Sequence, residues 1–183
     1  MRLLLPLGLL LVGCRGSENP MPLEVGNSWK YAVSTQFQQY LADVRVIRET
    51  SVGGHPGFVL AGATGESRVA WVDGTLIAER IANTRFVPAI PILVDTAERS
   101  RSHWKGQVQG NWGKFEGTAV LNQVASEELI GGLKTRVIKA ELTILNPKGK
   151  SIRLQTFFQP GVGIAEQRQW TGSNAVVTVE RQS

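Results

Sequence analysis

Apolar and polar residues alternate with a period of two along most of the chain after Trp29, which is the pattern of half-buried β-strands. The clearest example is residues 135–159, where two alternating segments flank the sequence NPKG at residues 146–149. Proline fixes its own φ and glycine accepts a positive φ, so this sequence predicts a hairpin turn. Windows of about a dozen residues show no helical period. We therefore predict an all-β fold of about eleven or more short strands, forming an antiparallel barrel or a strongly curved sheet.

The two halves of the chain carry similar motifs in the same order. The offset between matched motifs grows from 69 residues at the prolines (22 to 91) to 87 residues at Ile-Ala-Glu (77 to 164), as loop insertions would produce. We predict two tandem β repeats, residues 23–90 and 91–183, in one compact domain. The alternative is two runs of similar β composition. The matched pairs are residues 22–31 with 91–106, Gly53-Gly54 with Gly131-Gly132, and residues 77–79 with 164–166.

The N-terminus begins with Met1 and Arg2 and continues as an apolar run from Leu3 to Val12. This run is too short to cross a bilayer, which takes about 20 apolar residues. It fits the apolar region of a secretory signal, which is about 7–15 residues long and is followed by small residues at the cleavage point. The run closes with the sequence LVGC at residues 11–14.

This closing sequence resembles the bacterial lipobox, and Cys14 is the only cysteine in the chain. The resemblance implies that Cys14 receives a diacylglyceryl group and becomes the first residue after cleavage. Each buried methylene adds about 0.8 kcal/mol of membrane affinity, so two or three acyl chains would anchor the protein stably. We predict a signal peptide at residues 1–13, and a lipidated cysteine with its tether at residues 14–22. The alternative is a short buried segment with a chance cysteine.

Two further motifs resemble small secreted bacterial lipoproteins whose domains have no known function. One is the aromatic strand FFQPGVGIAE at residues 157–166, and the other is the opening P-L-x-x-G-x-x-W-x-Y at residues 22–31. The second copy of the opening departs from this pattern, because Asp95 stands where glycine would. Some relatives resemble half-open barrels of the LolA/LolB kind, which hold acyl chains. The resemblance implies no catalytic residues.

Composition and charge exclude several function classes. The formal charge is +5, but basic and acidic residues are interleaved, so no segment reads as a nucleic-acid-binding arm. The two histidines, His55 and His103, belong to no motif with metal-ligand spacing. The chain lacks a Gly-x-Ser-x-Gly motif, and each histidine lies in a predicted turn. We expect no metal, no cofactor and no enzymatic activity.

Residues 99–117 combine basic and aromatic side chains and form the candidate surface for a ligand or a partner. Basic and aromatic side chains together can bind single-stranded nucleic acid, but in an exported lipoprotein the available anions are lipid headgroups and acidic envelope polymers. The alternative is a solvated loop above a hydrophobic strand. The candidate residues are Arg99, Arg101, Trp104, Lys105, Trp112, Lys114 and Phe115.

These observations favour a non-enzymatic accessory or interaction protein of the cell envelope. It would be exported and anchored by lipidated Cys14, either on the periplasmic side of an outer membrane or on the cell surface. The alternative is a carrier or binder of a lipid or another hydrophobic ligand. A carrier requires a lined cavity, and alternation does not distinguish a cavity from a filled core.

Overall fold

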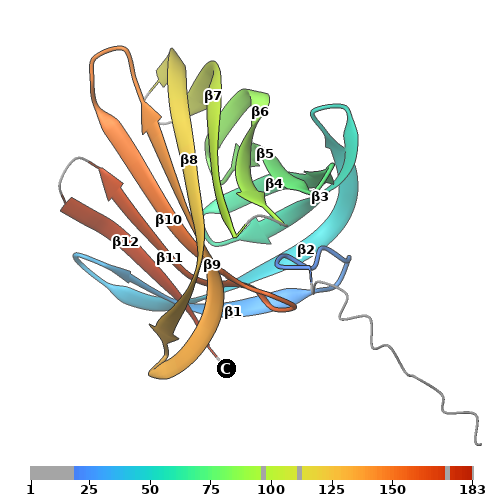
Figure 1. Cartoon of the computed structure of the whole chain (residues 1–183), viewed down its shortest axis with the longest axis vertical. Helices are drawn as coiled ribbons and strands as arrows, with labels where there is room; N and C mark the ends of the chain where they lie inside the picture. Colours follow the sequence, from blue (N-terminus) through green and yellow to red (C-terminus); the bar gives the residue numbers. More distant parts are fainter. Residues whose placement is uncertain (1–18, 96–97, 111–112, 172–173, 183) are drawn as a thin grey trace, which may run out of the picture.

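The computed structural model describes residues 19–95, 98–110, 113–171 and 174–182. They form twelve strands and no helix (Figure 1). No helix with the length and apolarity needed to span a bilayer occurs in this part of the chain. In chain order the strands are β1 (Ser28–Thr35), β2 (Gln39–Val52), β3 (His55–Gly62), β4 (Gly65–Val72), β5 (Thr75–Ile81), β6 (Thr84–Val94), β7 (Arg99–Gly110), β8 (Gly113–Ile130), β9 (Leu133–Leu145), β10 (Ser151–Gln159), β11 (Gly163–Thr171) and β12 (Asn174–Arg181).

The strands form a closed antiparallel barrel, which confirms the predicted fold class. Each strand pairs with the next one along the chain, and β12 pairs with β1 to close the barrel, with Tyr31 opposite Arg181. The hairpin predicted over residues 135–159 is present as β9 and β10. Its turn is held by Asn146, whose side-chain oxygen accepts hydrogen bonds from the backbone amides of Lys148 and Lys150, both at 2.9 Å.

Inward-facing side chains of both halves pack into one continuous core. Two aromatic residues of β1 also form hydrogen bonds with the β10–β11 turn and with β11. The indole of Trp29 donates a hydrogen bond to the Val162 carbonyl at 2.6 Å, and the Tyr31 hydroxyl donates one to the Ile164 carbonyl at 3.1 Å. Burial raises the pKa of Tyr31 well above its usual value, although the nearby charge of Arg181 opposes this shift. Core residues include Val46, Leu76, Ile90, Leu93, Leu121, Leu142 and Phe158.

The segment before β1 packs against the barrel. Met21 is 3% exposed and belongs to the core. The Trp71 indole donates a hydrogen bond to the Met21 carbonyl at 3.1 Å, and the amide of Gly161 donates one to the Asn19 carbonyl at 3.0 Å. Any free part of the tether predicted over residues 14–22 therefore ends before Asn19. The predicted signal peptide and Cys14 lie outside the described residues.

Strand β6 separates from β7 halfway along its length. The described ladder between them covers residues 85–87 and 107–109. Beyond it, the indole of Trp104 donates a hydrogen bond to the Pro88 carbonyl at 3.1 Å. The end of β6 is fixed instead by Gln123 of β8, whose side-chain amide bonds both the amide and the carbonyl of Val94, at 2.8 and 2.6 Å. The first half of β7 is therefore held mainly by β8.

Two long hairpins bend over the outer face of the barrel (Figure 1). We call residues 47–58 of β2 and β3 the first arm, and residues 125–137 of β8 and β9 the second arm. A Cβ added at Gly53 would lie 3.6 Å from Ile77 Cδ1, so the tip of the first arm reaches β5. A Cβ added at Gly131 would lie 3.7 Å from Glu180 Oε1, so the tip of the second arm reaches β12. Each arm thus lies against strands that are not its ladder partners.

The motifs matched between the two halves fall on strands that correspond in order. Trp29 and Trp104 lie on β1 and β7, the double glycines form the β2–β3 and β8–β9 turns, and the Ile-Ala-Glu sequences lie on β5 and β11. The predicted boundary between residues 90 and 91 lies inside β6, not between two elements. The internal repeat itself stays a prediction.

Candidate functional site

The alternation of β7 separates the basic side chains of the predicted surface from the aromatic ones. The basic residues point outward and are exposed, together with His103. Trp104 points inward, is 8% exposed and contacts Phe86 edge-on, with ring centroids 5.9 Å apart. Phe115 also packs against the core, while Trp112 lies outside the described residues. The described residues therefore do not form the predicted mixed surface. The exposed basic residues are Arg99, Arg101, Lys105 and Lys114.

Arg99 and Arg101 belong to two ranks of side chains that cross the outer face of β7, β8 and β9. The strand register sets one rank as Arg101, Asn122 and Glu141, and the next as Arg99, Val124 and Lys139. All six line one surface depression of about 520 Å³. Short side chains occupy the middle strand and longer charged ones flank it, so the depression lies above Asn122 and Val124.

The charges around this depression do not balance. It has three cationic side chains and one carboxylate, Glu141, which accepts a hydrogen bond from the Gln155 amide at 3.2 Å. Within the described residues, none of the three cations takes part in an ion pair. The Lys139 ammonium lies 5.8 Å from the centroid of the Phe157 ring. The depression therefore presents uncompensated positive charge to solvent.

A second depression of about 690 Å³ lies where β7 ends beside the second arm. Its charged residues are two acids, Glu98 and Glu127, and two bases, Arg99 and Arg136. Glu127 also pairs with Lys134 at 2.6 Å. Because its charges balance, this larger depression attracts anions less than the smaller one.

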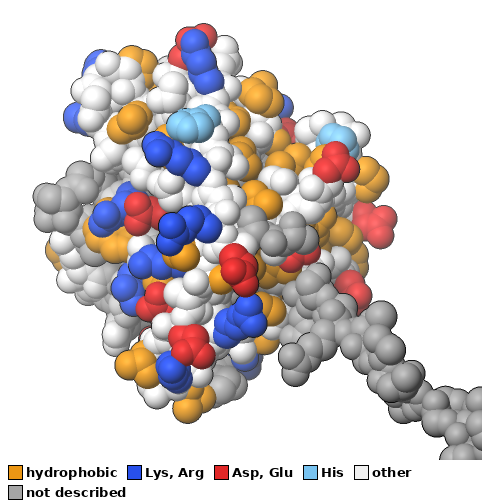
Figure 2. Space-filling view, in the orientation of Figure 1, with side chains coloured by type: hydrophobic (Ala, Val, Ile, Leu, Met, Phe, Trp, Pro, Cys, Tyr) orange, Lys and Arg blue, Asp and Glu red, His pale blue; other side chains and the backbone are white. Residues whose placement is uncertain are grey.

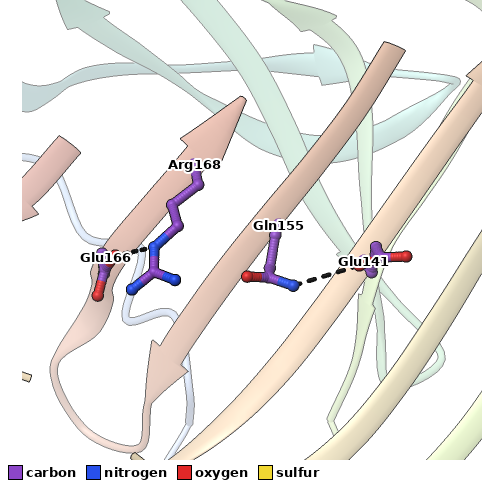
Figure 3. A network of polar contacts seen from close by, with 4 residues as sticks. All are labelled: Glu141, Gln155, Glu166 and Arg168. Atoms are coloured by element: carbon purple, nitrogen blue, oxygen red, sulfur yellow. Dashed lines mark hydrogen bonds and ion pairs between the residues drawn. The ribbon is translucent and has the colours of Figure 1, made fainter. Parts of the chain in front are cut away.

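Two polar pairs lie side by side on the neighbouring strands β9, β10 and β11 (Figure 3). After the Glu141–Gln155 bond, Arg168 pairs with Glu166 on β11, and the Arg168 guanidinium lies 5.3 Å from the centroid of Phe157. The Glu166 side chain is 8% exposed and that of Arg168 is 43% exposed. Lys139 and Arg168 thus both lie within cation–π distance of Phe157.

On the space-filling surface, Lys and Arg side chains run down the face that carries β7–β9, with acidic side chains interspersed (Figure 2). Sequence reasoning found Arg99 and Arg101 but missed Asn122, Lys139 and Glu141. The alternation of residues 135–159 places Lys139 and Glu141 on the polar side of their strand. Only the register brings them beside Arg99 and Arg101.

The described residues contain no group of three His, Cys, Asp or Glu side chains that could hold a metal ion. His55 and His103 are both exposed and lie on different strands, β3 and β7.

No family model and no curated protein matches this chain. Solved structures with a similar fold include a protein of Parabacteroides distasonis inferred to be a lipoprotein, with a TM-score of 0.53 and 9% identity. Another is a protein of Bacteroides fragilis inferred to be exported, which has a YmcC-like fold, with a TM-score of 0.49 and 12% identity. Each alignment covers 91% of this chain and 98% of the other. At 9% identity, the likeness to the Parabacteroides distasonis protein shows similarity of fold alone. The resemblance to barrels of the LolA/LolB kind stays a prediction.

Proposed function

We propose that this chain is an exported, lipid-anchored accessory protein of the bacterial cell envelope, without enzymatic activity, that binds an anionic envelope component. The observation that carries the proposal is the set of unpaired cations, Arg99, Arg101 and Lys139, around one depression on the outer face. Unpaired cations on a surface attract anions over about 8–10 Å at physiological ionic strength.

The anchor in this proposal rests on the N-terminal sequence. The apolar run closed by LVGC at residues 11–14 supports lipidation of Cys14. The fold likeness to a Parabacteroides distasonis protein inferred to be a lipoprotein agrees with export and anchoring. An anchored barrel stays near lipid headgroups and envelope polymers, which are the anions that a basic face would meet.

The carrier alternative has less support. Inward side chains from both halves form one continuous cluster, and Met21 and Leu23 of the N-terminal segment belong to it. A carrier would need to displace part of this packed core to hold an acyl chain. The outer face requires no such rearrangement.

The proposal is tested by photo-crosslinking in cells that express the full chain. A photoreactive residue replaces His103, which is exposed beside the depression, and in a matched variant it replaces Ser51, which is exposed on the first arm. We expect discrete adducts from position 103 that are absent from position 51. Identical background labelling at both positions would contradict binding at this face.

The same cells test the anchor when Cys14→Ser is introduced. We expect the protein to leave the membrane fraction and its maturation to change. Membrane binding with unchanged maturation would show that Cys14 is not the anchor. This outcome would leave the crosslinking result at position 103 interpretable on its own.

A further inference from the structure

We infer that the depression above Asn122 and Val124 is a phosphate-binding site, in which Arg99 and Arg101 contact the phosphate oxygens and Lys139 adds a third positive charge. The inference rests on the proposed function and specifies the chemistry of its ligand. It depends on the placement of three cations by the strand register, on their lack of ion-pair partners among the described residues and on the size of the depression.

The register brings the three cations around one point. Arg99 and Arg101 are two residues apart on β7, so they project from the same face with Cα atoms about 6.6–6.8 Å apart. Lys139 lies two strands away from Arg99, at about 9.4–9.8 Å between the strands. Only Asn122 and Val124 lie between, and both have short side chains. Long flexible cations can therefore converge on a group bound above the middle strand.

The number and type of cations favour phosphate over a single carboxylate. A guanidinium group donates two parallel hydrogen bonds to an oxyanion, and two such groups need more acceptor oxygens than one carboxylate supplies. A phosphate offers enough oxygens for two guanidinium groups and an ammonium at once. Glu141 is the one acid of the depression, and its hydrogen bond from Gln155 directs it toward β10.

The volume indicates that the ligand is larger than a free ion. A depression of about 520 Å³ has room for a phosphate and for the group that it esterifies. Trp104 and Phe115 face the core, so neither of these rings is available to stack a base at the depression. A phosphate ester without a nucleobase fits these features. Its source is either a lipid headgroup or a soluble phosphate ester.

The test uses the full chain with Cys14→Ser, so that its own lipid does not bind the vesicles. Calorimetry measures binding of glycerol 3-phosphate, and cosedimentation measures binding to phosphatidylcholine vesicles with and without phosphatidylglycerol. We expect saturable binding to glycerol 3-phosphate, to the anionic vesicles or to both, weakening as salt is added. Binding to the soluble ester alone identifies a soluble ligand, and binding to anionic vesicles alone identifies a headgroup.

A matched pair of variants assigns the binding to one depression. Arg101 lines only the smaller depression and Arg136 only the larger one, and both are exposed. We expect Arg101→Gln to weaken binding about tenfold or more, as for the loss of a charge-assisted hydrogen bond. Arg136→Gln should leave binding unchanged. Unchanged melting temperatures would show that both variants fold.

Three results would overturn the inference. They are no saturable binding of either probe, equal weakening by both variants, and glucuronate binding as tight as glycerol 3-phosphate. If discrete adducts at position 103 persist without phosphate binding, the inference fails and the proposed function stands. If glycerol 3-phosphate binds but position 103 gives only background labelling, the site stands and the proposed envelope partner does not.

Discussion

The two arms are built in the same way but pack on the barrel through different chemistry. Each is a long hairpin with a double-glycine tip that bends over the outer face of its own half. Val52 of the first arm is completely buried, as are Val59 on β3 and Ala70 on the neighbouring strand β4. Beside the base of the second arm, the outward-facing Phe157 is 2% exposed, and its neighbours in the register are Lys139 and Glu166.

The same kind of long hairpin therefore has different surroundings in the two halves of the barrel. The first arm approaches the barrel closely because Gly57 has no side chain: a Cβ there would lie 2.5 Å from the Val69 carbonyl oxygen. The tip of the second arm approaches the carboxylate of Glu180, and both depressions lie beside its base. We infer that both arms contribute to stability, and that charged groups also remain available at the surface beside the second arm.

Of the substitutions proposed to compare the two arms, Phe157→Ala should lower the free energy of unfolding most. Removing a buried phenylalanine costs about 3–5 kcal/mol, and here two cation–π contacts are lost as well. We expect the free energy of unfolding, measured by urea denaturation, to fall by about 3 kcal/mol. Phe37→Ala is the control, because Phe37 is 94% exposed and its removal should have little effect. A loss below about 1 kcal/mol would mean that the second arm does not depend on this ring.

Gly57→Ala should destabilise the first arm by a smaller amount. Its new Cβ would lie 2.8 Å from Val52 Cγ2 and 2.9 Å from Ala70 Cβ, so the arm would have to move away from β4. Overpacking of this kind costs about 1–3 kcal/mol, and we expect about 2 kcal/mol in the same denaturation experiment. Gly62→Ala on the same strand is the matched control, since its nearest neighbour would be Val44 Cγ2 at 3.3 Å. Equal losses in the two variants would argue against close packing of the first arm.

Glu166→Gln should have the smallest effect. It removes the charge that pairs with Arg168, and the side chain of Glu166 is 8% exposed. Because Arg168 is 43% exposed, solvent screens much of the interaction, and we expect a loss of about 1 kcal/mol. Asp43→Asn removes the acid of a pair with the same two-residue spacing, Arg45–Asp43, in which both side chains are exposed. Its effect should stay within about 0.5 kcal/mol.

Added salt tests whether the effect of Glu166→Gln on stability is electrostatic. It should reduce the difference between wild-type protein and Glu166→Gln, since ionic strength weakens partly exposed charge pairs. The contribution of Val52, Val59 and Ala70 should not fall with salt in the same way, because these residues are apolar, whereas the exposed Arg48–Glu66 pair of the first arm is screened. A Glu166→Gln effect that does not depend on salt would indicate loss of packing in place of loss of charge.

Most of the fold could be predicted from the sequence, because strand alternation and turn chemistry are local signals. The hairpin at residues 135–159 is one example. The first half of β7 was harder to recognise, because its inward positions Ser100 and Ser102 are polar and hide the period of two. The sequence therefore does not separate Trp104, which faces the core, from the exposed basic residues beside it.

Only the β7 residues of the candidate site could be predicted from the sequence. Arg99 and Arg101 are close in sequence to the other basic residues, but Lys139 reaches them only through the pairing of β8 with β7 and β9. Such a contact depends on register, which no short segment encodes by itself. The bending of the arms has the same origin, because it depends on what each hairpin packs against.

The way in which the barrel closes also determines when a growing chain can become stable. Tyr31 and Arg181 are paired although 150 positions separate them (31 to 181). Until β12 is present, β1 and β11 each expose an unpaired edge that can capture another chain. Pairing over such a distance is slow, so a newly made molecule stays vulnerable to aggregation until its last strand is in place. The pairing of β12, the final eight-residue strand, with β1 and β11 is therefore the step that closes the barrel and completes folding.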